Sequence, residues 1–447
     1  MINLFDKFDS PSRDLLFSER VAKLQIPTVV INDDGYTPDE IDSPMKEYCG
    51  LVSNRKPVYF DEVKIPRFWR NEGKADHATI YDLDRVRGRI LYAAGNNTRF
   101  VRDVQWFDEF GKITWVDHYS QHGQLFSKTY YDNGQPVTTN YYDRHGNEVL
   151  SNNLRAGDVF MDVNGRRRHF PNMSAFTKFY LEEKHYQLNH ILYNTLDKSF
   201  GTSFQLSATE GSDVLFWHEK LGDELPGNMK MMFDSKDPLR TKNIVFQDYR
   251  DWTNKQAIIP QDNDIQVRYL GMIYPHPRGN KLRPNALVFT NTDQVAQLEN
   301  LVQLMPNIQF HVAAITEMSS KLLTIGKYPN AHMYPGILPD KIKELVADCD
   351  IYLDINHGNE ILDAVRGAFE QNMLILGFKD TIHEPKFVAQ ENIFDSTPDG
   401  AQAMAGQIMG SLVSPDLMKR KIDQQRQEAS DVYAEDYQKA FEELFNV

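Results

Sequence analysis

Regularly spaced glycines constrain the fold of one part of this chain more than any other feature. Gly111, Gly123, Gly134 and Gly146 follow one another at spacings of 12, 11 and 12 residues. Each glycine closes a short polar turn, and glycine readily adopts the left-handed backbone that hairpin turns require. The repeat therefore predicts an antiparallel meander. Its expected strands cover residues 113–119, 125–131, 136–142, 148–154 and 158–163.

Large aromatic rings follow the strands of this predicted meander. Because side chains alternate between the two faces of a strand, the rings should fall on both faces of the sheet. An open aromatic face would suit a protein partner or an acceptor chain. The alternative is cross-strand pairing that only holds the ribbon together. The candidate partner or acceptor residues are Trp106, Trp115, Tyr119, Tyr130 and Tyr141.

Alternating strand and helix patterns surround the meander. After the Pro- and Gly-rich segment 275–285, short apolar runs and amphipathic stretches alternate, which is typical of a doubly wound parallel sheet. The stretch 175–196 is expected to be one helix. The predicted fold class is therefore α/β, with two Rossmann-like domains and an inserted antiparallel meander. The expected parts are 1–80 and 171–275 for the first domain, 81–170 for the insertion, 276–430 for the second domain, and 431–447 for a C-terminal helix that packs back on the body.

Composition excludes several classes of function. A formal net charge of −14 argues against a general nucleic-acid grip. Cys49 and Cys349 are too few for a disulfide framework or a cysteine-ligated zinc site, and we expect no metal. No apolar run has the length of a membrane span and no leader pattern opens the chain, so a cytoplasmic location is expected. The basic run at 166–170 could contact anionic lipid or a partner.

The segment 334–378, "YPGILPDKIKELVADCDIYLDINHGNEILDAVRGAFEQNMLILGF", contains a strand, a turn, a helix and a second strand. It resembles the donor-site segment of retaining GT-B glycosyltransferases. In that family two glutamates eight positions apart contact the reacting sugar and the ribose, and the matching positions here are Asn359 and Gly367. The resemblance implies a vestigial donor pocket at His357, Gly358, Asn359, Glu360 and Gly367.

Two other parts of the family's donor machinery are absent. The basic pair that follows the first strand of the second domain has no counterpart, because residues 286–300 contain no Arg or Lys. The glycine-rich loop of the N-terminal domain has none in "MINLFDKFDSPS". The "NDDG" at 32–35 is either an Asp-Gly turn or a carboxylate pair, Asp33 and Asp34, at the end of a strand. We therefore expect no catalytic residue and no cofactor.

The whole chain resembles a family of non-catalytic, stabilising subunits. These belong to the bacterial glycosyltransferase complex that modifies serine-rich repeat adhesins before export by the accessory Sec system. "PTVVINDDGYTPDEIDSP", the meander and "DINHGNEILDAVRGAFEQNMLILGF" carry the likeness. It implies a homologous catalytic partner that uses UDP-N-acetylglucosamine. It also implies that this chain binds the unglycosylated adhesin and stabilises the partner, in the cytoplasm and peripherally on the inner face of the membrane.

Two other functions stay open on the sequence. An atypical retaining transferase would use Glu360 or the Asp33 and Asp34 pair. A lectin-like subunit would bind repeats that already carry sugar.

Overall fold

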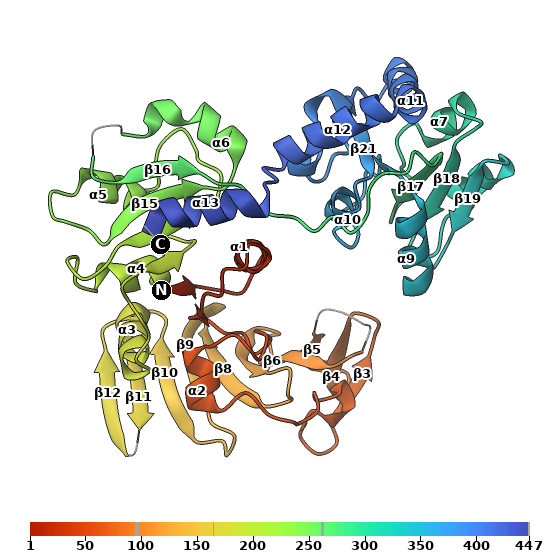
Figure 1. The fold of residues 1–447 in the computed structure, drawn as a ribbon. Helices are drawn as coiled ribbons and strands as arrows, with labels where there is room; N and C mark the ends of the chain where they lie inside the picture. Colours follow the sequence, from red (N-terminus) through yellow and green to blue (C-terminus); the bar gives the residue numbers. More distant parts are fainter. Residues whose placement is uncertain (94–97, 164, 261–262, 446–447) are drawn as a thin grey trace. The chain divides into compact units, whose positions relative to one another are not determined.

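The computed structural model describes residues 1–93, 98–163, 165–260 and 263–445. The chain divides into two compact units (Figure 1). The first unit comprises Met1–Val245 and Ala257–Arg268, and the second comprises Phe246–Gln256 and Tyr269–Val447.

The first unit contains a six-stranded sheet in which β14, β13, β1 and β2 are parallel. Its strand order is β16-β15-β14-β13-β1-β2. Asn3 of β1 lies opposite Leu192 on one side and Thr28 on the other. Strands β1, β2, β13 and β14 are buried along their length because each carries an apolar run, as parallel sheets with covered faces require. The bounds of the six strands are β1 Ile2–Phe5, β2 Thr28–Val30, β13 Ile191–Tyr193, β14 Asp213–Trp217, β15 Thr241–Phe246 and β16 Gln266–Tyr269.

Five α-helices belong to the described part of this unit. They are α1 Ser10–Val21, α2 Pro44–Cys49, α3 Met173–Glu183, α4 Lys198–Phe204 and α5 Gly227–Asp234. The expectation of one helix over 175–196 is wrong. α3 ends at Glu183, His185 has a left-handed φ of 57°, and Ile191 begins the buried strand β13. A left-handed residue stops a helix, and the short strand behind it was hidden in the same apolar pattern.

The predicted meander is confirmed as part of a ten-stranded antiparallel sheet in the first unit. Its strands lie side by side in chain order, from β12 to β3 (Figure 1). The five expected strands agree with the structure to within one residue at each end. The bounds are β3 Arg70–Gly73, β4 His77–Asp82, β5 Arg85–Tyr92, β6 Val101–Phe107, β7 Ile113–Tyr119, β8 Leu125–Asp132, β9 Gln135–Tyr142, β10 Glu148–Asn153, β11 Val159–Val163 and β12 Arg166–Phe170.

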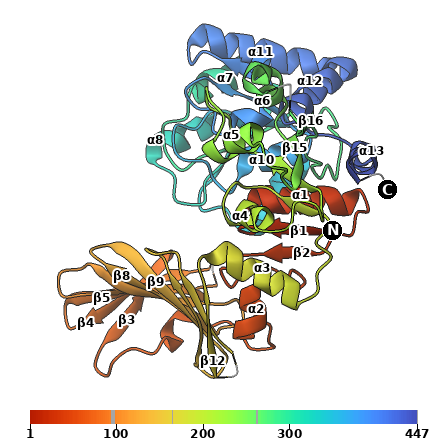
Figure 2. The ribbon, with the colours of Figure 1, turned by 90° about the vertical axis from the view of Figure 1, so that its left-hand side faces the viewer.

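The sheet begins earlier than the glycine repeat does. Its first strand starts at Arg70, so the limit expected between residues 80 and 81 falls inside β4. The β4–β5 hairpin turns at Leu83 and Asp84, where Leu83 has a φ of 54°. Because a leucine occupies this left-handed position, the turn lacks the glycine that marks the later hairpins. At one edge of the sheet α3 contacts β12, and further in α2 contacts β9 (Figure 2).

The second unit contains a six-stranded parallel sheet of order β19-β18-β17-β20-β21-β22. Apolar side chains of its strands and of α7, α11 and α12 form one buried core. The strands are β17 Asn285–Phe289, β18 Gln309–Ala313, β19 Ala331–Tyr334, β20 Ile351–Asp354, β21 Leu374–Phe378 and β22 Ile393–Phe394. The helices are α6 Tyr249–Asn254, α7 Leu298–Leu304, α8 Ser320–Leu323, α9 Pro339–Asp348, α10 Ala364–Glu370, α11 Pro398–Val413, α12 Pro415–Glu428 and α13 Ala434–Phe445.

Two features bind the ends of the second unit to its body. The carboxylate of buried Asp350, at the start of β20, accepts hydrogen bonds from the guanidinium groups of Arg278 and Arg283 at 2.5 to 3.2 Å. Near the C-terminus, the buried Tyr437 of α13 donates a hydrogen bond to the carbonyl of Gly271 at 2.9 Å. The segment 278–283 and the last helix are therefore held by specific polar contacts.

No helix among the described residues is long and apolar enough to cross a membrane. Cys49 and Cys349 are both buried and unpaired, and burial raises the pKa of each thiol to about 12.

Candidate functional site

The segment that resembles a donor site forms the expected strand, loop and helix, β20 followed by residues 355–363 and α10. Asp354 ends β20, and its carboxylate lies 2.6 Å from Nδ1 of His383. The other ring nitrogen of His383 lies 2.7 Å from the carbonyl oxygen of Gly358. Burial alone would lower the pKa of His383, but the bonds to Gly358 and Asp354 raise it above its ordinary value. This histidine ties the loop to the end of the strand.

Gly358 is needed for packing within the loop. A Cβ atom at this position would lie 1.8 Å from Oδ1 of Asn291. The amides of Asn291 and Asn356 both donate hydrogen bonds to the carbonyl of Asn359 at 3.2 Å. The side chain of Asn359 is exposed. Contacts within the loop therefore account for the glycine without any ligand.

Glu360 has a structural partner at the start of the helix. Its carboxylate accepts a hydrogen bond from the backbone N–H of Val365 at 3.0 Å, and burial raises its pKa. An acid in this position satisfies a free N–H and favours the positive end of the helix. Gly367, at the position of the second family glutamate, faces open space, because a Cβ added there would have no atom within 4 Å. The strand, loop and helix of a donor site are therefore present, while the carboxylate of Glu360 is used in a hydrogen bond within the chain.

His357 faces a different hollow of the second unit. It lines a groove of about 720 Å³ together with residues 293–300, Gln303, Lys321, Leu322, Thr324 and Ile325. Its Nε2 lies 4.0 Å from the carboxylate of Asp380. Of the five predicted residues, Gly358, Asn359 and Glu360 thus share one hydrogen-bonded loop, whereas His357 and Gly367 stand apart from those bonds.

The corresponding edge of the first unit also ends in acids that cap helices. Asp9 accepts a hydrogen bond from the N–H of Ser12 at 3.2 Å and caps α1. Asp6 is buried at the end of β1 and accepts from the N–H of Ser199, in the first turn of α4, at 2.7 Å. In dinucleotide-binding folds, the diphosphate accepts hydrogen bonds from the backbone N–H groups at such a helix start. Here carboxylates of the chain itself accept the hydrogen bonds from these N–H groups.

The "NDDG" stretch contains a turn that joins β2 to the meander. Asp33 is buried and accepts hydrogen bonds from the N–H of Gly35 and the hydroxyl of Ser43, both at 2.8 Å. Gly35 has a φ of 84°, and a Cβ there would lie 2.8 Å from the backbone of Ser120. The turn interpretation therefore holds for Asp33. Asp34 also accepts a hydrogen bond in the turn, from the N–H of Tyr36 at 3.0 Å, and its other carboxylate oxygen forms an ion pair with Arg102 at 2.8 Å.

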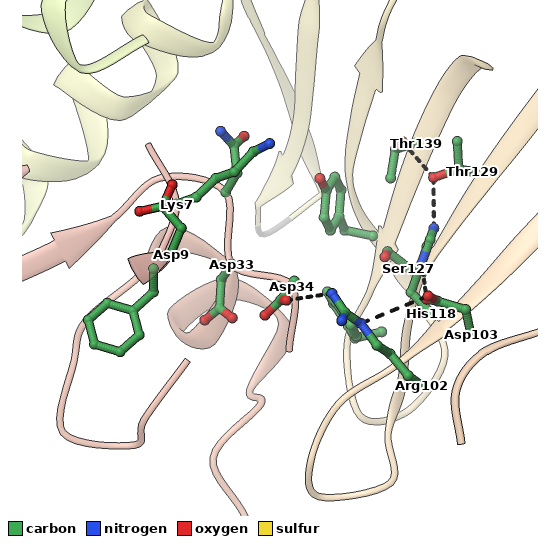
Figure 3. A pocket seen from close by; sticks show the side chains of 14 residues that line it. Lys7, Asp9, Asp33, Asp34, Arg102, Asp103, His118, Ser127, Thr129 and Thr139 are labelled. Atoms are coloured by element: carbon green, nitrogen blue, oxygen red, sulfur yellow. Dashed lines mark hydrogen bonds and ion pairs between the residues drawn. The ribbon is translucent and has the colours of Figure 1, made fainter. Parts of the chain in front are cut away.

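Asp34 and Arg102 border a cavity of about 490 Å³ in the first unit (Figure 3). Its walls are the loop after β1, the turn after β2, and one face of strands β6 to β9. From Asp103 a line of hydrogen bonds crosses this face through His118 and Thr129 to Thr139, at 2.7, 2.9 and 3.0 Å. The lining residues are Lys7, Phe8, Asp9, Asn32, Asp33, Asp34, Arg102, Asp103, His118, Phe126, Ser127, Thr129, Thr139 and Tyr141.

The sequence reasoning missed most of this cavity. The sequence did contain a signal for it: Ser127 and Thr129 lie two residues apart on β8 and so share one face, as do Thr139 and Tyr141 on β9. Ser127 pairs with Tyr141, and Thr129 pairs with Thr139, across one hairpin. Period-two placement of hydroxyl groups on neighbouring strands predicts a polar face.

The five aromatic candidates occupy different environments. Trp106 is 9% exposed and stacks on Trp115 with ring centroids 5.7 Å apart. Both rings belong to a cluster covered by residues 58–69, and the half-buried Tyr119, whose pKa burial raises to about 12, packs on the same cluster. Tyr130 is 39% exposed, and Tyr141 lines the cavity on the opposite face. The rings therefore do not form one open surface.

Four family models match successive parts of the chain. They are described as the GtfB N-terminal domain over residues 2–48, the GtfB middle domain over 69–171, the GtfB third domain over 173–258, and the GftB/GlyA-F C-terminal domain over 286–425. The middle-domain match has nearly the limits of the ten-stranded sheet.

Full-length relatives and solved structures agree with these matches. The chain is 51% identical over 440 residues to the "UDP-N-acetylglucosamine--peptide N-acetylglucosaminyltransferase stabilizing protein GtfB" of Limosilactobacillus reuteri, covering 98% of both chains. It is 37% identical to the protein of the same name from Streptococcus gordonii, covering 99% of both. A chain in the crystal structure of a GtfA/B complex bound to UDP and GlcNAc matches with a TM-score of 0.93 and 37% identity over 100% of both chains.

More distant structures establish the fold class alone. The pneumococcal O-GlcNAc transferase GtfA matches with a TM-score of 0.57 at 9% identity, covering 100% of this chain and 99% of that chain. TarM matches with a TM-score of 0.53 at 13% identity, with the same coverage. The predicted α/β, GT-B-like fold class is confirmed. On the strength of the full-length relatives, the chain belongs to the GtfB family of glycosyltransferase-stabilising proteins.

Proposed function

We propose that this chain is the non-catalytic subunit of a protein O-GlcNAc transferase complex. It binds a homologous catalytic glycosyltransferase and stabilises it, and it binds the unglycosylated serine-rich acceptor. The partner uses UDP-N-acetylglucosamine, and the complex works in the cytoplasm, peripherally on the membrane. The names of the relatives and the GtfA/B complex structure support the partner.

The observation that carries the non-catalytic role is the internal use of acids at the helix starts. Glu360 bonds the N–H of Val365 in α10, and Asp9 bonds the N–H of Ser12 in α1. A nucleotide diphosphate binds where backbone N–H groups and the helix dipole favour negative charge. A carboxylate already in that place removes a donor and repels the phosphate. Asn359 and Gly367, at the positions of the family's glutamates, supply no replacement charge.

Membrane contact has weaker support. Arg166, Arg167 and Arg168 are exposed on the edge strand β12. The guanidinium groups of Arg167 and Arg168 lie over the rings of Phe160 and Phe179, at 4.8 and 4.7 Å from the ring centroids. Three basic side chains can add attraction to an anionic leaflet, at about 1 kcal/mol each.

A transfer assay with separated subunits tests the proposal. The purified chain, the catalytic subunit and their mixture are each incubated with UDP-N-acetylglucosamine and a serine-rich acceptor. We expect no transfer by this chain alone, and more transfer and less aggregation of the catalytic subunit in the mixture. Transfer by this chain alone would overturn the non-catalytic role.

Substitution of Glu360 separates this role from an atypical transferase. Glu360→Gln should leave transfer by the complex within about twofold of the unaltered complex, because this acid takes no part in the reaction. Loss of transfer with intact assembly would assign the reaction to Glu360. Tighter binding of glycosylated than of bare acceptor would instead support the lectin-like function.

A further inference from the structure

The cavity between the N-terminal loops and the meander contains polar groups that have no partner in the described part of the chain. They are the ammonium of Lys7, the side-chain amide of Asn32 and the hydroxyls of Ser127 and Tyr141. Ser127 is 3% exposed, and burial raises the pKa of Tyr141. Buried polar groups such as these two hydroxyls cost free energy unless they are hydrogen-bonded, whereas Lys7 is exposed and Asn32 is half-buried. A ligand that bonds the hydroxyls of Ser127 and Tyr141 would recover that cost.

The other polar groups of the cavity already bond one another. Asp34 is paired with Arg102, and Asp103 with His118, while Thr129 bonds both His118 and Thr139. These bonds hold the strand face in one geometry (Figure 3), so the hydroxyls of Ser127 and Tyr141 are presented from a fixed wall. Asp9 and Lys7 lie on the opposite wall, on the loop after β1. Fixed groups bind a ligand at a smaller entropic cost than mobile ones.

The charge of the lining decides the class of ligand. Four carboxylates, from Asp9, Asp33, Asp34 and Asp103, stand against the two permanent cations of Lys7 and Arg102. A surplus of negative charge disfavours phosphates and acidic peptides. The free amide and hydroxyls both donate and accept hydrogen bonds, as do the hydroxyls of a neutral ligand. The rings of Phe8, Phe126 and Tyr141 add apolar surface for its carbon atoms.

We propose that this cavity binds an uncharged, hydroxyl-rich segment of the acceptor, with Asn32, Ser127 and Tyr141 as its hydrogen-bonding groups. This proposal rests on the proposed function, because it places acceptor recognition on the first unit. The hydroxyls come either from serine and threonine side chains or from N-acetylglucosamine attached to them. Its volume of about 490 Å³ is in the range of sites that enclose small ligands.

Binding of two matched peptides to the full chain tests the cavity. One is an uncharged serine- and threonine-rich peptide, and the other has every hydroxyl residue replaced by alanine or valine. The first peptide is also prepared with N-acetylglucosamine attached. Asn32→Ala with Tyr141→Phe should weaken binding of the hydroxyl-bearing peptide by at least about tenfold, since each lost bond is worth roughly 1 kcal/mol. Tyr131→Phe, on the same sheet but outside the cavity lining, should leave binding unchanged.

A labelling experiment avoids reliance on variants that alter packing. Cys49 and Cys349 are buried, so a cysteine introduced at exposed Lys7 can be labelled alone on the folded protein. A bulky maleimide on Lys7→Cys should block the hydroxyl-rich peptide, whereas the same label on Lys112→Cys, in the exposed β6–β7 turn, should not. Weakening of the bare peptide assigns the site to serine and threonine, and weakening of the glycosylated peptide alone assigns it to the sugar.

The two proposals fail in different ways. Unchanged peptide binding by both the double variant and the labelled Lys7→Cys protein would overturn the cavity as a binding site. If those proteins still stabilise the catalytic subunit, the proposed function stands. If the unaltered chain fails to stabilise that subunit or to bind the acceptor at all, the proposed function itself is wrong.

Discussion

Glu19 is a fully buried acid on α1, where it packs toward β1. The amide of Asn3 donates a hydrogen bond to one carboxyl oxygen at 2.5 Å, and the other oxygen has no bond among the described residues. Burial raises the pKa of Glu19 to about 8. The folded state therefore holds a proton that the unfolded state releases near its ordinary, lower pKa. This contribution to stability is fully present at low pH and is lost as the pH rises toward 8.

Glu19→Gln removes this dependence while it keeps the side chain's size. We expect the variant to match the original protein near about pH 5 and to be more stable by about 1–3 kcal/mol near pH 8. Thermal unfolding across that range measures the difference. Glu109→Gln, in an exposed turn, serves as the control and should show no such trend. A constant difference between Glu19→Gln and the original protein would contradict a protonated Glu19.

Two glycines of the donor-like segment should respond oppositely to alanine. At Gly358 a Cβ would collide with Asn291, whose amide bonds the carbonyl of Asn359. Moving Asn291 loses that bond, so Gly358→Ala should destabilise the protein by about 1–3 kcal/mol. At Gly367 the helix surface is open, and alanine should stabilise it by about 0.5–1 kcal/mol. Denaturant unfolding of the two variants provides the comparison, and equal effects would contradict the geometry of the loop.

At the scale of elements, glycine turns made the meander predictable. Gly111, Gly123, Gly134 and Gly146 all have left-handed φ values between 72° and 84°. Their spacing located five strands because a hairpin turn demands this backbone locally. The Leu83 turn and the end of α3 at His185 were missed because non-glycine residues take the same backbone there. Local sequence does not reveal that strain when tertiary packing imposes it.

Gly123 has a second constraint that Gly111 lacks. A Cβ at Gly123 would lie 2.4 Å from the carbonyl oxygen of Lys56, whereas Gly111 faces open space. Left-handed backbone destabilises both alanine variants by about 1–2 kcal/mol. Gly123→Ala should lower the free energy of unfolding by more than Gly111→Ala does, because its Cβ also pushes the turn away from residues 56–58. Urea midpoints of the two variants test this difference, and equal midpoints would show that the turn is not packed against that segment.

The candidate site was less predictable than the fold. That Asn359 and Gly367 stand where the family has glutamates could be predicted from the sequence, because this needs only an alignment with the family's donor-site segment. The hydrogen bond from the N–H of Val365 to Glu360 and the packing of Trp106 and Trp115 could not be predicted, because each depends on the segments folded around these residues. The covering of the tryptophans by residues 58–69 is a long-range contact. Period-two alternation indicates which rings share a face, but it does not show what covers that face.

For the whole molecule, the proposed role predicts which ligand stabilises the chain. A partner that binds only the folded form raises the free energy of unfolding by about 2.7 kcal/mol at a hundred times its Kd. We therefore expect the catalytic subunit to raise the unfolding temperature of this chain. UDP-N-acetylglucosamine alone should leave it unchanged, because Glu360 and Asp9 already occupy the helix starts. Thermal unfolding of the isolated chain, with each ligand in turn, measures both effects. The unfolding temperature of Glu360→Gln should also not respond to the nucleotide sugar, since the family's glutamates and basic pair remain absent. A rise in the unfolding temperature of the original chain with UDP-N-acetylglucosamine would mean that its donor pocket still binds the nucleotide sugar.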